Sequence, residues 1–215
     1  MDFFKKCETA NFAKILQEKG MAWFQNGPYD LNIIGVRSDQ SNQVTNLFDD
    51  ALVVVYMTNR AAKAANANWS KNVYPITTEP GTYYMTKKLL NKKGTAILVP
   101  GQYRGAYTIG KHNGKYTALV QIGNVKVYRD GNKNMEYDLE PQTIQEGTFG
   151  INIHRSNEFH ESTFVNNYSA GCQVFANPNH FDSFMRLCKR QREFFPKSTF
   201  TYTLLEEKDL IYFLK

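Results

Sequence analysis

From residue 73 onward the chain consists of short segments rich in β-branched and aromatic residues, separated by glycine, proline, asparagine or aspartate. The segments read GTAILV, AYTIG, YTALVQI, VKVYRD, TFGINIH and GCQVF. Short segments that are closed by turn-forming residues are typical of a β-sandwich or a barrel-like sheet. The pattern therefore predicts a mostly β, α+β fold built on a twisted, mostly antiparallel sheet.

Helices are expected to flank this sheet near the two ends of the chain. The first 20 residues form an amphipathic pattern that places Phe12, Ile15 and Leu16 on one face and stops at Gly20. A second helical pattern covers about residues 180–195 and ends before Pro196. The segments LNIIGVR and LFDDALVVVYMT predict two more strands, and the final segment, STFTYTLLEEKDLIYFLK, predicts two strands around a charged turn.

The remaining segments predict one domain over residues 1–215. The alanine- and asparagine-rich segment NRAAKAANANWSK is interpreted as a long loop or hairpin tip. The sequence contains no internal repeat and no composition typical of a linker. A length of 215 residues, 42% of them hydrophobic, is enough to bury a substantial core.

The composition and the N-terminal segment predict where the protein acts and what kind of partner it binds. The longest apolar run, ALVVVYM, is far shorter than the roughly 20 residues that span a bilayer, so no transmembrane segment is expected. The N-terminus lacks the apolar core of a signal peptide, which predicts a protein that stays in the cytoplasm or leaves without a signal. The net charge of +6 favours an acidic partner, and the scattered lysines and arginines do not favour nucleic acid over an anionic cell wall.

Three cysteines are present, and their spacing predicts neither a disulfide framework nor a metal site, so no metal and no cofactor are expected. Cys7 and Cys188 lie in helical patterns and are expected to be buried. Cys172 differs, because it follows Ser169, Ala170 and Gly171 in a turn of small residues. A thiol in such a turn is uncrowded and is a candidate nucleophile.

His154 is the candidate base for this thiol. It ends the alternating segment FGINIH on its polar face and would meet Cys172 if the two segments paired. The pair would supply a thiol with a depressed pKa, and the amides of Gly171 and Cys172 would supply donors for an oxyanion. His112, in the turn GKHNGK, is interpreted as a surface residue.

The order His154, fourteen residues, then Ser169-x-Gly171-Cys172 resembles the signature of L,D-transpeptidases, the YkuD-type peptidoglycan enzymes. The upstream run YPITTEPGTYYM is similar to a second segment of that family, so the resemblance covers about residues 73–175. It implies an L,D-transpeptidase-like sheet, Cys172 as nucleophile, His154 as base and Ser169 as the residue that orients the imidazole.

Three positions depart from the family pattern. Arg155 follows the histidine where the family has glycine, and Gln173 and Val174 follow the cysteine where the family has an aliphatic residue and then arginine. Arg37, Arg104 and Arg155 are the candidates to replace the missing charge. The predicted substrate contacts are Arg155, Gln173, Arg37 and Tyr168.

The resemblance implies a peptidoglycan-acting cysteine enzyme. Its thiol would form a thioacyl-enzyme with a stem peptide and pass the acyl group to water, as in an endolysin-like peptidase, or to an amine, as in a transpeptidase. The segments GINIH and SAGCQVF also resemble phage-associated proteins, which implies action on the cell wall after release from an infected cell. The alternative is a non-catalytic wall-binding or virion structural module on the same scaffold.

Overall fold

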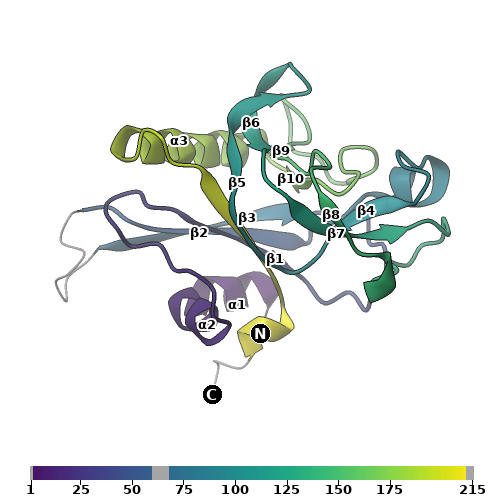
Figure 1. Ribbon diagram of the computed structural model, residues 1–215, viewed down its shortest axis with the longest axis horizontal. Coiled ribbons are helices and arrows are strands. Elements are labelled where there is room, and N and C mark those ends of the chain that lie inside the picture. The colour runs from purple at the N-terminus through teal and green to yellow at the C-terminus, as the bar shows by residue number, and fades with distance from the viewer. Residues whose placement is uncertain (1, 60–67, 212–215) are drawn as a thin grey trace.

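The predicted strands pair into two sheets in the computed structural model, which describes residues 2–59 and 68–211 (Figure 1). Strand exceeds helix, at 35% against 21%, so the prediction of a mostly β, α+β fold is confirmed. The segment predicted as a long loop or hairpin tip covers residues 59–71, of which 60–67 lie outside the described residues. Its end differs from the prediction, because residues 69–71 already belong to the following strand and pair with the preceding one. Its flanking strands pair antiparallel, with Met57 opposite Trp69.

The larger sheet closes on itself. Its strands, in hydrogen-bonded order, are β1 (Asn32–Arg37), β11 (Phe200–Glu206), β5 (Gly101–His112), β6 (Tyr116–Gln121), β9 (Ile153–Arg155), β10 (Gln173–Phe175), β3 (Trp69–Thr77) and β2 (Asp50–Met57). β1 runs parallel to β11 and β9 parallel to β10, and the other neighbours are antiparallel. The expectation of a mostly antiparallel sheet is therefore correct.

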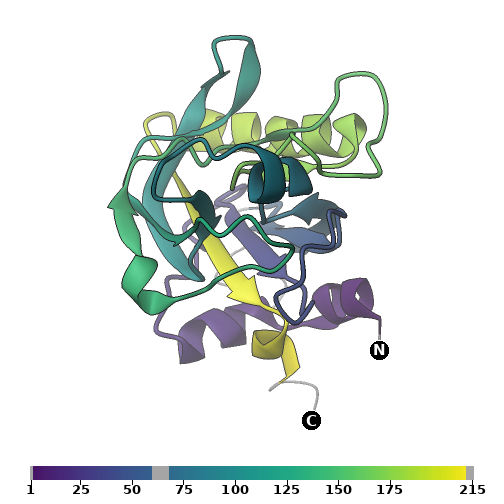
Figure 2. The ribbon, with the colours of Figure 1, turned by 90° about the vertical axis from the view of Figure 1, so that its right-hand side faces the viewer.

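The smaller sheet contains three antiparallel strands, β4 (Thr95–Leu98), β7 (Val125–Asp130) and β8 (Gln145–Gly147). A π-helical turn, η1 (Tyr83–Lys87), precedes it, and a 3₁₀ turn, η2 (Pro141–Thr143), leads into β8. Figure 1 shows this sheet at the end of the molecule opposite α3 (Pro178–Phe194), and Figure 2 views the molecule from that end.

The N-terminal helical pattern forms two short helices instead of one, α1 (Phe3–Thr9) and α2 (Phe12–Glu18). The break falls at Asn11, whose side chain accepts a hydrogen bond from the Lys14 amide and so starts the second helix. The predicted face is correct, because Phe12, Ile15 and Leu16 are buried. Helix α3 covers the second predicted helix and begins at the cap Asn177.

The C-terminal segment corrects a prediction. β11 forms as expected, but a short helix, α4 (Lys208–Ile211), takes the place of the second strand. The last pair of β11 joins Glu206 to Arg37, where β1 ends, so the chain loses its partner strand there. The Asp209 carboxylate accepts a hydrogen bond from the Glu206 amide and stabilises the turn into α4.

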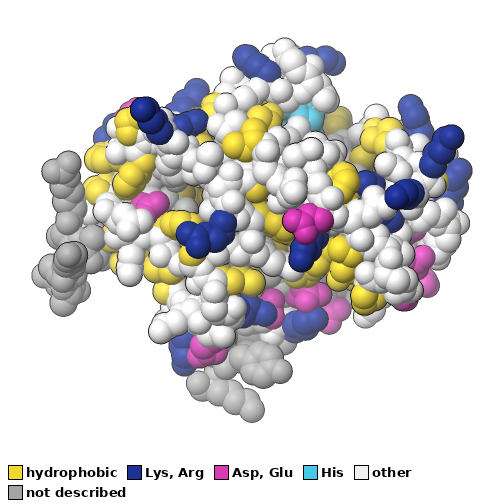
Figure 3. Space-filling view, in the orientation of Figure 1, with side chains coloured by type: hydrophobic (Ala, Val, Ile, Leu, Met, Phe, Trp, Pro, Cys, Tyr) yellow, Lys and Arg dark blue, Asp and Glu magenta, His cyan; other side chains and the backbone are white. Residues whose placement is uncertain are grey.

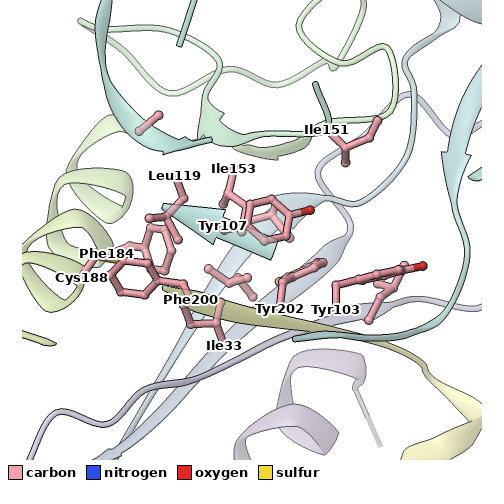
Figure 4. Packing of buried hydrophobic residues seen from close by; sticks show 14 of the residues in the cluster. Ile33, Tyr103, Tyr107, Leu119, Ile151, Ile153, Phe184, Cys188, Phe200 and Tyr202 are labelled. Carbon is pink, nitrogen blue, oxygen red and sulfur yellow. The ribbon is translucent and has the colours of Figure 1, made fainter. Parts of the chain in front are cut away.

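The core holds the site strands in place. Buried residues of both sheets and of α3 belong to one hydrophobic cluster. Figure 4 shows Leu119 of β6 and Ile153 of β9 above Tyr107 and Phe184 in this cluster, and Leu119 and Ile153 are register partners. All four side chains are fully buried, and burying a large apolar side chain contributes about 1.5 to 3 kcal/mol. β9 is only three residues long, so this packing fixes its position more than its few ladder bonds do.

The surface in Figure 3 carries lysine and arginine side chains dispersed over the visible face, in keeping with their scatter in the sequence. Within the described residues, every helix is too short or too polar to cross a membrane.

Candidate active site

The two segments that carry the candidate nucleophile and base pair with each other. β9 and β10 are parallel neighbours in which Val174 lies opposite His154. The first register pair joins Gln173 to Ile153, and the Gln173 amide donates to the Asn152 carbonyl oxygen at 2.9 Å. Cys172 therefore lies immediately before the paired part of β10. His154, Asn152 and Cys172 all line one cleft of about 890 Å³. The pairing on which the sequence prediction depended is therefore present.

The loop before β9 supplies the surroundings of the sulfur. The Cys172 thiol donates to the Gly150 carbonyl oxygen at 3.4 Å, and the backbone N–H of Asn152 donates to the sulfur. Gln121 fixes this loop from β6, because its side-chain oxygen accepts from the Phe149 and Ile151 amides at 3.1 and 2.9 Å. Gln121 could not be found from the sequence, since no local pattern places residue 121 beside residues 149–151.

Ser169 and Gly171 build the turn that carries Cys172. The Ser169 hydroxyl donates to the Cys172 carbonyl oxygen at 2.8 Å and accepts from the Gly171 amide at 3.1 Å. Gly171 has a φ of +117°, and a Cβ there would lie 2.3 Å from the Ala96 carbonyl oxygen, so only glycine fits. Ser169 was expected to orient the imidazole through its hydroxyl or its carbonyl, but the hydroxyl bonds within the turn and the carbonyl oxygen accepts from the Gly81 amide at 3.0 Å. The Gly171 N–H, expected as an oxyanion donor, is committed to Ser169.

His154 is oriented by its own strand. Its Nδ1 lies 2.8 Å from the Arg155 carbonyl oxygen and 3.2 Å from the Tyr116 hydroxyl, which itself donates to that carbonyl. A carbonyl oxygen can only accept, so Nδ1 carries the proton and Nε2 is the basic nitrogen. The Arg155 carbonyl thus performs the orienting task that the resemblance gave to Ser169.

A second imidazole lies against the first. The rings of His112 and His154 stack with centroids 4.0 Å apart and planes 20° apart. Asn152 approaches Nδ1 of His112 at 3.0 Å through its side-chain amide. His112 is half-buried and lines the cleft, which corrects its interpretation as a surface residue. Its position at the end of β5, paired across the sheet, is not visible in the local sequence.

Burial shifts the pKa values of both candidate groups towards their neutral forms. Burial raises the pKa of the Cys172 thiol to about 11, partly offset by the Asn152 N–H. Burial first, and the neighbouring His112 second, lower the pKa of His154 to about 3. Desolvation disfavours both charged forms, and a thiolate–imidazolium pair would have to overcome both penalties. The expectation of a depressed thiol pKa is therefore wrong for the resting protein.

The predicted substrate contacts divide into two groups. Arg155 and Tyr168 line the cleft with Cys172. Gln173 is fully buried, and its side chain accepts from the Tyr202 hydroxyl at 2.7 Å, so it belongs to the core. Arg37 is also buried, pairs with Glu79 at 3.0 Å and lines a separate cavity of about 220 Å³. Gln173 and Arg37 are thus placed away from the cleft.

The residues that the structure describes contain no group of three or more histidine, cysteine or acidic side chains placed to hold a metal ion.

Comparison of the chain with known proteins found no matching family model, no matching curated protein and no matching solved structure. The function must therefore be argued from the cleft itself.

The neutral resting pair makes a measurable prediction for thiol alkylation. Cys172 is partly exposed, whereas Cys7 and Cys188 are fully buried, so iodoacetamide should label Cys172 first. A thiol pKa near 11 means that the thiolate fraction, and hence the labelling rate, rises about tenfold per pH unit between pH 7 and 10. Peptide mapping of the adduct across this range measures both. A rate that levels off near pH 7, or preferential labelling of Cys7 or Cys188, would contradict this account.

Proposed function

We propose that this chain is a cysteine acyl-transfer enzyme that acts on peptidoglycan stem peptides, with Cys172 as nucleophile and His154 as general base. The observation that carries the proposal is that His154 lies on β9, Cys172 directly precedes the adjacent parallel strand β10, and both residues line one cleft. The protonated Nδ1 of His154, held by a backbone carbonyl, supports the role of Nε2 as the base. A nucleophile, its base and a group that orients the base are the minimal set for covalent acyl transfer.

The chemistry follows from the neutral pair. As the sulfur of Cys172 attacks the substrate carbonyl carbon, its proton passes to Nε2 of His154, so the two charges need not exist separately beforehand. The carbon–nitrogen bond of the peptide then breaks, and the imidazolium returns its proton to the leaving amine. The thioacyl-enzyme is resolved when water or an amine attacks the same carbon and gives a proton to His154. The carbon–sulfur bond then breaks, and the imidazolium returns that proton to the Cys172 sulfur, which restores the neutral pair.

Two observations favour peptidoglycan as the substrate. The His154 to Cys172 motif resembles the signature of peptidoglycan L,D-transpeptidases, and the net charge of +6 suits an anionic cell wall. The resemblance to phage-associated proteins places the proposed action after release from the producing cell. The polar cleft wall, which includes Asn91, Asn113 and Asn167, is compatible with bound water near the thioacyl group. Hydrolysis is therefore proposed ahead of cross-linking.

Digestion of purified sacculi tests the function. The protein is incubated with sacculi in heavy-oxygen water. The products are separated by chromatography, and their masses are measured by mass spectrometry. Hydrolysis predicts new muropeptides whose carboxylates carry the label. Unlabelled new dimers would instead make the protein a transpeptidase. Protein that sediments with the sacculi and leaves their muropeptides unchanged would contradict an enzyme and favour the wall-binding or structural module.

His112 offers a prediction about the base. Replacing His112 with alanine removes the ring stacked on His154 and opens space beside it, whereas phenylalanine preserves a stacked ring without a charge. We expect the alanine variant to lose about tenfold or more in kcat and the phenylalanine variant to retain most of it, because orientation of the base contributes on this scale. Equal activity of all three proteins would show that the stack does not position His154.

A further inference from the structure

The charged residues on the cleft wall are all cationic among the residues that the structure describes there. Lys115, Arg129 and Arg155 line the cleft, and its described lining includes neither aspartate nor glutamate. A cleft with charges of one sign attracts ligands of the opposite sign and focuses the field on them. The two arginines differ, however, in whether a carboxylate of the protein already neutralises their charge.

Arg155 is balanced by the protein itself. Its guanidinium lies 2.8 Å from the Glu158 carboxylate and 4.0 Å from that of Asp182. It also lies over the ring of Tyr116, 4.4 Å from the centroid. Its charge is therefore largely satisfied before any ligand arrives.

Arg129 has only neutral partners within the described residues. It lies in β7, is 8% exposed and takes part in none of the ion pairs formed by the part of the chain that is described. Its Nε donates to the Gln145 side-chain oxygen at 3.1 Å and its Nη1 to the Gly94 carbonyl oxygen at 3.3 Å. The guanidinium carbon lies 4.7 Å from the centre of the Phe149 ring.

A guanidinium in this position is held in place but not neutralised. Arginine stays protonated in proteins, and a charge with little access to water is strongly unfavourable without an opposite charge. Burial is the cause that lowers the pKa of Arg129, and no carboxylate raises it. A guanidinium has five N–H donors, and two of its nitrogens donate to these partners, so donors remain for a ligand in the cleft.

The position of Arg129 connects it to the reacting sulfur. Phe149, under the guanidinium, precedes Gly150, whose carbonyl accepts the Cys172 thiol. Ala96 of β4 is the register partner of Arg129. Its carbonyl oxygen lies so close to Gly171 that a Cβ on that residue would clash with it. A ligand that contacts Arg129 from the cleft would therefore extend along the wall that holds the thiol.

We propose that Arg129 forms an anion subsite that binds a carboxylate of the acyl-donor peptide and so sets the position of the scissile carbonyl at Cys172. A guanidinium can bind a carboxylate with two parallel hydrogen bonds, which fixes orientation as well as position. The identity of the ligand as an acyl donor rests on the proposed function, whereas the anion subsite does not.

The test measures binding without turnover. In a Cys172→Ala background, N-acetyl-alanyl-alanine with a free carboxylate is compared with its C-terminal amide and with inorganic phosphate by NMR titration. We expect the carboxylate to bind at least about tenfold more tightly than the amide, because only the carboxylate pairs with the guanidinium. Equal affinity for carboxylate and amide, tighter binding of phosphate, or no binding of any of the three would overturn the carboxylate subsite.

Two variants locate the site. Arg129→Gln should weaken carboxylate binding about tenfold or more, while the control Arg186→Gln, which removes an exposed arginine of α3 outside the cleft lining, should change it less than about threefold. Arg129→Lys keeps the charge and should restore part of the affinity. Equal losses in the Gln variants would overturn the assignment, and the carboxylate–amide comparison stands even if Arg129→Gln does not fold.

The outcomes separate this inference from the proposed function. Sacculus cleavage by the native protein, with no preference for carboxylate over amide, would remove the subsite and leave the enzyme. Selective carboxylate binding at Arg129, with unchanged sacculi, would leave the subsite and remove the enzyme.

Discussion

Cys172→Ala is expected to abolish the change in muropeptides, to below about one thousandth of the native rate, because no other group can form the thioacyl bond. The same variant should keep its free energy of unfolding within about 1 kcal/mol, since the side chain is partly exposed and its sulfur loses only a long hydrogen bond to the Gly150 carbonyl, at 3.4 Å, and the weak one accepted from the Asn152 amide. Rates are measured on sacculi and stability by denaturant unfolding. Residual turnover in this variant would contradict the assignment of the nucleophile.

Cys188→Ala is the matched control for that experiment. Cys188 is fully buried in the main hydrophobic cluster, so its truncation should cost about 1 to 2 kcal/mol of stability. It lies outside the cleft lining and should retain the native rate. Cys172→Ala is therefore expected to lose activity and keep its stability, whereas Cys188→Ala is expected to keep its activity and lose stability.

Gly171→Ala is expected to be the most damaging small substitution near the site. It forces an alanine to a φ of +117° and places a Cβ 2.3 Å from a backbone oxygen of Ala96, so the turn or β4 must move. We expect a loss of roughly 3 kcal/mol in unfolding free energy, together with loss of activity, because the same turn carries Cys172. Thermal or denaturant unfolding, together with the sacculus assay, checks both effects.

Gly114→Ala separates backbone strain from the clash. Gly114 also has a positive φ, +72°, but nothing lies within 4 Å of a Cβ placed there. This control should lose only about 1 kcal/mol and should keep its activity. If the two variants were equally stable and equally active, the close approach of Gly171 to Ala96 would have no importance.

The sequence predicted those parts of the fold that depend on local patterns. Short, nearly continuous apolar runs located β1 and β2, which are buried at every position, and helical spacing located α3. The break between α1 and α2 was missed although Asn11, a good cap, marked it. The helix α4 was missed because its cause is the end of a partner strand that lies far away in the sequence.

The candidate site was predictable only where its residues are close in the chain. His154 and Cys172 could be proposed from a short motif, and their strands do pair. His112 and Arg129 come from β5 and β7 and reach the cleft only through sheet pairing, which a single sequence does not reveal. The direction of the thiol pKa shift was also wrong, because burial raises the pKa of Cys172 and the extent of that burial depends on the folded chain rather than on the local motif.

The central claim is that Cys172 takes an acyl group from a stem peptide with the help of His154. Its most direct test is acid quenching of the protein during incubation with purified muropeptides, followed by proteolysis and mass spectrometry. The account predicts an added mass equal to the peptide acyl group on the fragment that contains Cys172, removable by hydroxylamine and strongly reduced in His154→Ala. An acyl group on another residue, or muropeptides and protein that both remain unchanged, would contradict it.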